Sequence, residues 1–144
     1  MFLPKYLADS SALLNLVGVR DSLARPRNLT KLVSQGRLRI PDAVAREIRK
    51  KDDRLRNWVE RHGRDCVLEA TDDNIAELQR IGRSYVQYLG DKAGSADPIC
   101  VCMAIYYRGS GFVTLTDDAG IQVVCLFEKV PYVTSSGFCR LECI

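Results

Sequence analysis

The sequence predicts one α/β domain over residues 1–144, with three layers and a central, mostly parallel sheet between the helices. Short apolar strand candidates alternate along the chain with longer segments of helical periodicity, and this order is typical of parallel sheets covered on both faces. The length of 144 residues, with 47% hydrophobic and 27% charged residues, fits a single compact domain with a real core.

The first quarter of the chain has clear start and stop signals. Residues 5–8 are short and apolar, which predicts a buried strand, and Asp9 or a following serine suits the N-cap of a helix over residues 10–17. The sequence around Pro26 breaks this pattern, and a second helix follows that ends at Gln35-Gly36.

Residues 37–40 alternate polar and apolar as a half-buried strand does, and Pro41-Asp42 starts the next helix. The apolar positions that follow predict two helices or one bent helix, with the bend at residues 50–53. They are Val44, Ile48, Leu55, Trp58 and Val59. Residues 66–68 fit either a loop or a strand.

The second half predicts a helix from residues 71–74 onward, a loop at residues 89–94 and a deeply packed helix over residues 99–106. The middle helix carries its apolar residues on one side: Ile75, Leu78, Ile81, Tyr85 and Leu89. Ser95 before Asp97-Pro98 is a capping signal for the packed helix. Residues 112–116 predict a buried strand, residues 121–127 are a further apolar stretch, and residues 131–134 predict a last strand.

Several protein classes do not fit this chain. No window holds the roughly 18 uncharged apolar residues that a membrane helix needs. Asp9 interrupts the apolar start, so we expect a strand there and not a signal peptide. The six cysteines include no Cys-x-x-Cys pair and there is one histidine, His62, so we expect reduced, mostly buried thiols and a cytoplasmic protein.

Positive charge is concentrated in residues 20–64, which hold 14 Lys and Arg against 6 Asp and Glu. Such a segment can attract a polyanion. A basic run by itself is more often a solvated helix face, so this pattern alone does not predict nucleic-acid binding.

Acidic residues fall where a parallel sheet collects its ligands, beyond the carboxyl ends of the strands. Asp9 follows the first predicted strand, and Asp117-Asp118 follows the strand over residues 112–116. Asp97 opens a helix that starts at the same edge. Glu47 lies beside the apolar stripe of its helix, where a carboxylate needs a cation nearby. We therefore expect these acids to converge.

Converging carboxylates repel one another, and a divalent cation removes that conflict. Mg²⁺ and Mn²⁺ prefer oxygen ligands and can activate a water against a phosphodiester. Taken singly, each acid also has a structural interpretation. Asp9 and Asp97 suit helix caps and Asp117-Asp118 suits a turn. Glu47 can pair with Lys51, one helical turn on. A capping aspartate keeps one oxygen free, so capping and metal binding are compatible.

Four short motifs in this order resemble those of PIN domains, the fold of VapC-type toxins and related ribonucleases. They are residues 6–14 (YLADSSALL), 40–48 (IPDAVAREI), 96–98 (ADP) and 113–118 (VTLTDD). Within that family the chain looks most like the DUF4411 subgroup, through residues 51–58 and 121–125. The likeness covers nearly the whole chain, and the four motifs together are more specific than any one of them.

The resemblance implies a PIN-like fold and a Mg²⁺- or Mn²⁺-dependent endoribonuclease. The metal-binding and catalytic acids would be Asp9, Glu47, Asp97 and Asp118. Asp117 stands next to Asp118, so which of the two faces the metal is open. Ser11 would orient Asp9 or the attacking water.

The resemblance also implies an RNA substrate, a cognate antitoxin protein of a type II toxin–antitoxin pair, and a homodimer. Under this interpretation the basic segment gains a role, because several of its cations flank Glu47 and would hold RNA phosphates near the metal. These candidate RNA-binding residues are Arg46, Arg49, Lys50 and Arg54.

Two rival functions are weaker. A non-catalytic PIN-like module would bind RNA or a partner protein and keep the acids as remnants. A phosphoacceptor receiver domain would need a second acid after its first strand, where this chain has Ser10 and Ser11, and a lysine after a late strand, where Lys129 is poorly placed.

Overall fold

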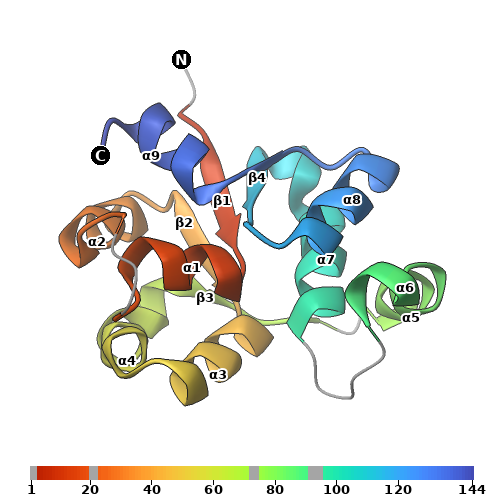
Figure 1. Cartoon of the computed structure of the whole chain (residues 1–144), viewed down its shortest axis with the longest axis horizontal. Helices are drawn as coiled ribbons and strands as arrows, with labels where there is room; N and C mark the ends of the chain where they lie inside the picture. The colour runs from red at the N-terminus through yellow and green to blue at the C-terminus, as the bar shows by residue number, and fades with distance from the viewer. Residues whose placement is uncertain (1–2, 20–22, 72–74, 91–95) are drawn as a thin grey trace.

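The computed structural model describes residues 3–19, 23–71, 75–90 and 96–144, and its centre is a five-stranded sheet flanked by helices (Figure 1). The strand order is β3-β2-β1-β4-β5, and each neighbouring pair is parallel. This confirms the predicted α/β class and agrees with a three-layer arrangement. The strands are β1 (Lys5–Ala8), β2 (Leu38–Pro41), β3 (Val67–Leu68), β4 (Phe112–Leu115) and β5 (Tyr132–Val133).

Helices connect the strands within the described ranges. They are α1 (Ser10–Val17), α2 (Pro26–Ser34), α3 (Asp42–Lys51), α4 (Asp53–Cys66), α5 (Ile75–Ser84), α6 (Val86–Leu89), α7 (Ala96–Tyr107), the 3₁₀ turn η2 (Arg108–Ser110), α8 (Ala119–Glu128) and α9 (Ser135–Glu142). Side-chain caps begin α1, α4, α8 and α9, where an Asp or Thr oxygen accepts from a backbone N–H in the first turn. The proline at the first position of α2 has the fixed φ that a helix start needs.

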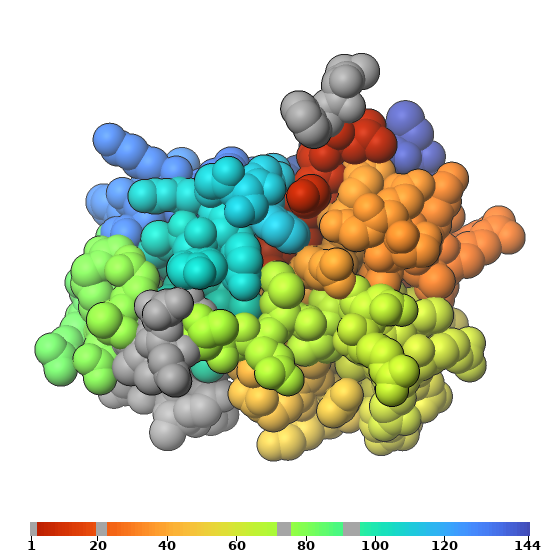
Figure 2. Space-filling view, turned by 180° about the vertical axis from the view of Figure 1, so that it is seen from behind, coloured from red at the N-terminus to blue at the C-terminus, as the bar shows by residue number. Residues whose placement is uncertain are grey.

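The two faces of β1 lead into different parts of the core. Tyr6 and Ala8 pack with buried residues of α1 to α4 and α9, whereas Leu7 packs with buried residues of α5 to α8. This alternation is the period of two that a strand buried on both faces must show. Seen from behind in Figure 2, the end of α4 and β3, in yellow-green, cross the lower part of that face between the β2 side and the α7–β4 side.

The register of β1 and β4 sets the position of the site. Lys5 pairs with Phe112 and Ala8 pairs with Leu115, so the two central strands end level with each other. The residues that follow these strands therefore leave the same edge of the sheet side by side. That edge is where Asp9 and residues 116–118 lie.

Most element boundaries match the sequence prediction, and four features differ from it or extend it. The apolar helix expected up to Leu89 is interrupted at Tyr85, so that α5 ends at Ser84 and α6 begins at Val86. Residues 66–68, which fitted a loop or a strand, contain β3, and the apolar stretch 121–127 lies in α8. Helix α9 was not predicted, because few of its residues are apolar. Its anchor is Phe138, which packs edge-on against Tyr6 with the ring centroids 4.8 Å apart.

Parts of three predictions fall outside the described residues: the helix start at residues 72–74, the loop at residues 91–94 and the cap at Ser95. In the ranges that are described, no helix has the length and apolar composition that crossing a membrane requires. All six cysteines are free thiols, and four of them are buried: Cys66, Cys100, Cys102 and Cys125.

Candidate metal centre

Asp9 lies directly after β1 and is 2% exposed, and its carboxylate is held from several sides. Its N–H donates to the Leu115 carbonyl at 3.0 Å, which continues the pairing of β1 with β4. The Thr116 hydroxyl donates to Oδ2 at 2.6 Å, and the Ala12 N–H donates to Oδ1 at 3.0 Å. The Ser11 hydroxyl lies 2.9 Å from both carboxylate oxygens, where it can fix their orientation.

Asp118 is linked to Asp9 through one threonine. The Thr116 hydroxyl that donates to Asp9 accepts from the Asp118 N–H at 3.1 Å. Asp118 Oδ1 accepts from the Ile121 N–H at 2.8 Å and caps α8. Within the described residues Oδ2 makes no hydrogen bond, so this aspartate combines a capping oxygen with one that is available to a ligand.

Asp117 makes its hydrogen bonds with residues of α1 and α9. Its Oδ2 accepts from Asn15 Nδ2 at 2.6 Å and from the Ser135 hydroxyl at 2.5 Å, and its Oδ1 accepts from the Ser135 N–H at 2.8 Å. The Asp117 N–H donates to the Ser11 hydroxyl at 3.0 Å. Asp117 thus ties α1 to the start of α9, and of the two adjacent aspartates it is Asp118 whose charge acts on Asp9 and Asp97.

Glu47 lies on α3, and Lys51 one turn further on places Nζ 2.8 Å from Glu47 Oε1. The ion pair that the sequence allowed is therefore present. Although burial opposes ionisation, Lys51, the Ser10 hydroxyl and the Ala96 N–H hold the pKa of Glu47 below its usual range. The contribution of Ala96, the first residue of α7, places Glu47 next to Asp97.

Asp97 joins the four acids into one electrostatic unit. Burial raises its pKa to about 6, and the charges of Asp118, Asp9 and Glu47 raise it in that order, while Lys51 opposes them. Burial likewise raises the pKa of Asp9 to about 6, against its hydrogen bonds and with a contribution from Asp118. We call Asp9, Glu47, Asp97 and Asp118 the acid cluster. Its members come from four separate stretches of chain, and the charges of the other three act on Asp97.

The acid cluster is not a preformed cage. Across residues 3–19, 23–71, 75–90 and 96–144, no three histidine, cysteine or acidic side chains stand together in an arrangement that could hold a metal ion. Carboxylates that raise one another's pKa repel, and Glu47 is drawn to Lys51, so some separation is the expected resting geometry.

The donor chemistry of the cluster nevertheless suits Mg²⁺ or Mn²⁺, which take oxygen ligands and keep several waters. A second observation also favours a polar ligand. Ser10 is 7% exposed, and its hydroxyl is buried without a hydrogen-bond partner of normal geometry, next to Glu47. Buried polar groups nearly always have a partner, which ordered water or an ion can supply.

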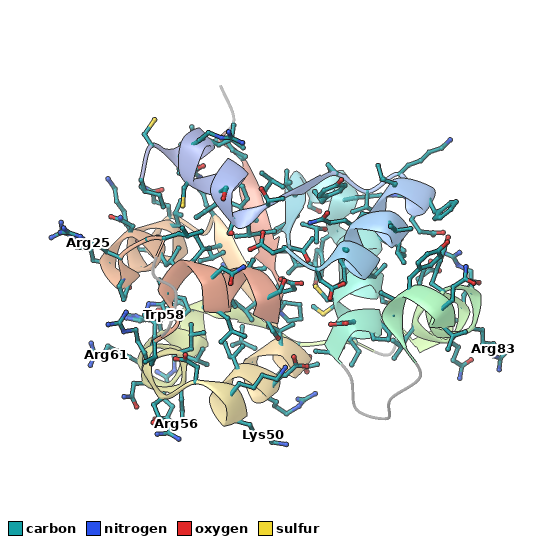
Figure 3. The ribbon with its side chains drawn as sticks, in the orientation of Figure 1. Arg25, Lys50, Arg56, Trp58, Arg61 and Arg83 are labelled. Atoms are coloured by element: carbon teal, nitrogen blue, oxygen red, sulfur yellow. The ribbon has the colours of Figure 1, made fainter. Side chains whose placement is uncertain are left out.

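The four candidate RNA-binding cations border three different hollows. Arg46 and Arg49 line a hollow between α3 and α4, Lys50 lines a different one beside α1, and Arg54 lines a third near the start of α2. In Figure 3, Lys50 projects outward, as do three arginines that were not among these four candidates, one directly before α2 and two in α4. They are Arg25, Arg56 and Arg61.

Sequence reasoning missed Ser10, Asn15 and Ser135. Ser135 lies 18 residues after Asp117 in a helix that was not predicted, and only the folded chain brings the two together. A signal for Ser10 did exist, because it directly follows Asp9 in a buried stretch. Thr116 was part of a motif, but its role as the bridge from Asp9 to Asp118 depends on the register of β1 and β4.

A protein-family model matches most of this chain. The family model described as "Domain of unknown function (DUF4411)" matches residues 6–142, which is nearly the whole chain and includes every member of the acid cluster. No curated protein matches the chain.

Proposed function

The chain belongs to the DUF4411 family, and from its acid cluster we propose that it is a divalent-metal-dependent endoribonuclease of the PIN-domain type. The observation that carries the proposal is the geometry at the carboxyl edge of the sheet, where one hydroxyl, that of Thr116, donates to Asp9 and accepts from the Asp118 N–H. The raised pKa of Asp97, to which burial and the charges of Asp118, Asp9 and Glu47 contribute, agrees with it. Acids that are brought together against their own repulsion need a cation.

Each acid has a part in this proposal that follows from its contacts. Asp9, held by Ser11, Ala12 and Thr116, is the most rigid oxygen donor. Asp118 presents Oδ2 while Oδ1 keeps α8 in place. Asp97 lies in the first turn of α7, where a helix N-terminus favours negative charge. Glu47 lies in the middle of α3 and is paired with Lys51.

When bound, Mg²⁺ or Mn²⁺ would supply positive charge for the phosphodiester and lower the pKa of a bound water. Ser11 would keep the Asp9 carboxylate in a single orientation, since its hydroxyl contacts both oxygens and is itself fixed by the Asp117 N–H. Asp117 would then act as a positioning residue, which explains why two aspartates stand side by side.

Asp9→Asn tests this proposal. The variant keeps the cap of α1, because asparagine also accepts from the Ala12 N–H, but it lacks the negative charge. We expect Mn²⁺-dependent cleavage of single-stranded RNA to fall at least about 100-fold, with an unchanged circular dichroism spectrum. Asp65→Asn, the same change at an exposed residue of α4, is the matched control and should cleave normally. Full activity of Asp9→Asn would remove Asp9 from the metal site.

A non-catalytic PIN-like module is the second candidate, and the lack of a preformed cage in the described residues is the observation that favours it. Calorimetry separates the two functions. Mn²⁺ binding that disappears in Asp9→Asn supports the nuclease. RNA binding without any Mn²⁺ binding supports the module.

The PIN-type proposal extends to partners and setting. We infer an RNA substrate, a cytoplasmic location, a homodimer and a cognate antitoxin protein encoded next to this chain. A small DNA-binding or peptidase-like protein in the neighbouring reading frame, able to suppress toxicity when the two are expressed together, would support the toxin role. Harmless expression of the chain alone would count against it.

A further inference from the structure

Lys51 is a cation at the edge of the acid cluster. It lies in the last turn of α3, with Nζ 2.8 Å from Glu47 Oε1, and its charge also lowers the pKa of Asp97. The spacing of four residues and the position at the helix C-terminus both favour this ion pair. The side chain is nevertheless 53% exposed, so water screens the ion pair and holds it only weakly.

Lys51 also borders an open hollow of about 640 Å³ beside the C-terminal end of α1. The other residues that line it are Leu14, Asn15, Gly18, Val19, Lys50, Asp52 and Asp53. The two acids among them are already engaged. Asp52 accepts from the N–H groups of Val19 and Leu55, and Asp53 pairs with Arg56 at 2.9 Å. Among the described lining residues, Lys50 and Lys51 are the cations that this hollow offers to a ligand.

The same hollow adjoins the acid cluster through two of its residues. Lys51 contacts Glu47, and Asn15 donates to Asp117, the neighbour of Asp118. A phosphate group held in this hollow would therefore lie beside the acid cluster. An ammonium group binds phosphate as a compact point charge on a flexible stem.

We propose that Lys51 is a movable counter-ion. It neutralises Glu47 while the acid cluster holds no divalent ion, and it turns into the neighbouring hollow when one binds, where it and Lys50 hold a phosphate of single-stranded RNA. This inference rests on the proposed nuclease function. Its physical basis is that an ammonium group and a divalent cation repel each other at contact distance around one carboxylate, and that the long, half-exposed lysine stem can leave at little cost.

Calorimetric titration of Mn²⁺ into the metal-free full chain tests the first half of the proposal. Lys51→Met removes the competing charge and should raise Mn²⁺ affinity about two- to fivefold, the equivalent of an exposed ion pair. Lys51→Arg keeps the charge and should bind like the wild type. Lys50→Met is the matched control, because Lys50 forms no ion pair with a described residue, and it should change the affinity by less than about 1.5-fold. In a Glu47→Gln background, Lys51→Met should give no gain.

A merely structural role for Lys51 would lower metal affinity or leave it unchanged, so either result overturns the counter-ion proposal. The Mn²⁺ titrations also distinguish failure of the counter-ion proposal from failure of the nuclease proposal. If the wild type binds Mn²⁺ and Lys51→Met binds it equally, only the counter-ion idea is lost. If neither protein binds Mn²⁺, the nuclease proposal fails with it.

Steady-state cleavage of a short single-stranded RNA at saturating Mn²⁺ tests the second half. Lys51→Met should raise KM about three- to tenfold, with kcat within about twofold, because a phosphate contact is lost and the reacting groups are intact. Lys51→Arg should restore most of the loss. An unchanged KM would exclude the hollow as a phosphate site.

Discussion

Opposite charges are paired at one end of the sheet, whereas like charges lie near one another at the other end. At the amino end, Glu142 of α9 accepts from the Tyr6 hydroxyl and from Arg37, each at 2.5 Å, and Arg37 also donates to the Pro4 carbonyl. One carboxylate there meets one guanidinium. At the carboxyl end, four carboxylates of the acid cluster gather beside Lys51, and two of them have raised pKa values.

We infer that the charged groups at the amino end contribute to stability, whereas those at the carboxyl end serve the proposed function. The carboxylate and the guanidinium of the amino-end network are paired with each other. The network links α9 to β1 and to Arg37, the residue before β2. Within the described residues the acid cluster brings four carboxylates under each other's influence with one lysine, Lys51, an arrangement that costs stability and that the proposed divalent ion would offset. Variants at the two ends should therefore fail in different ways, and each of the following changes tests that contrast.

The largest effect should come from Asp118→Asn. Asparagine still caps α8 through its side-chain oxygen, so the free energy of unfolding should change by less than about 1 kcal/mol, whereas Mn²⁺-dependent RNA cleavage should fall at least about 100-fold. Asp117→Asn is the matched neighbour. It loses acceptors for Asn15 and Ser135 and should cost about 1–3 kcal/mol of stability. Urea unfolding and RNA-cleavage assays on both variants test this contrast. If Asp117→Asn lost cleavage and Asp118→Asn lost stability, the assignment of Asp118 to the metal site would be wrong.

Arg37→Met should be the most damaging change at the amino end. Both partners of the ion pair are about nine-tenths buried, with side-chain exposures of 11% and 10%, so removal of the arginine leaves Glu142 without its cation. We expect a loss of about 2–4 kcal/mol in the free energy of unfolding, measured in urea. Cleavage per folded molecule should be unchanged. A loss of Mn²⁺ affinity in this variant would show that the two ends are coupled.

Asp97→Asn should stabilise the metal-free protein at pH 7. Because burial and the neighbouring acids raise the pKa of Asp97 to about 6 from 3.8, the folded state binds its proton more tightly than the unfolded state does. This contribution to stability is complete below pH 3.8 and is lost as the pH rises through about 6. Asp97 is partly exposed, so we expect a gain of only about 1 kcal/mol in the variant.

Urea unfolding of wild type and Asp97→Asn between pH 4 and pH 7.5 measures this gain. The stability difference should shrink toward zero at the acidic end of the range. Saturating Mn²⁺ should stabilise the wild type and reverse the order at pH 7, since a ligand that binds only the folded state adds to its stability. A wild type that is the more stable protein at pH 7 without metal would contradict the idea of a strained acid cluster.

The smallest effect should come from Arg46→Gln. Arg46 is 63% exposed and lies 3.6 Å from Asp42, so the ion pair should contribute less than about 0.5 kcal/mol. If Arg46 contacts RNA, the affinity for single-stranded RNA should fall a few-fold and depend less steeply on salt. An unchanged affinity and salt dependence, measured by fluorescence anisotropy, would remove Arg46 from the RNA-binding surface.

Local signals in the chain were sufficient for much of the fold. The strand at residues 5–8 and the helix at residues 10–17 were predicted with the observed bounds, since a short apolar run, an N-cap and helical spacing all act on neighbouring residues. Helix α9 was not predicted from the sequence, because its buried apolar anchor, Phe138, packs against Tyr6 at the other end of the chain. The break between α5 and α6 at Tyr85 was not predicted either, because the apolar residues keep their helical spacing across it.

The sequence by itself determined the alternation of strands and helices and the placing of single acids at strand ends and helix starts, because these follow from residues that are close along the chain. Only the tertiary structure decided that Asp118 is linked to Asp9 through Thr116 while Asp117 turns to Ser135, and that the charge of Lys51 acts on Asp97 as well as on Glu47. Those outcomes depend on strand register and on the packing of α3, α7 and α9, which are contacts between distant segments. Two adjacent aspartates are chemically identical until the fold gives each of them different neighbours.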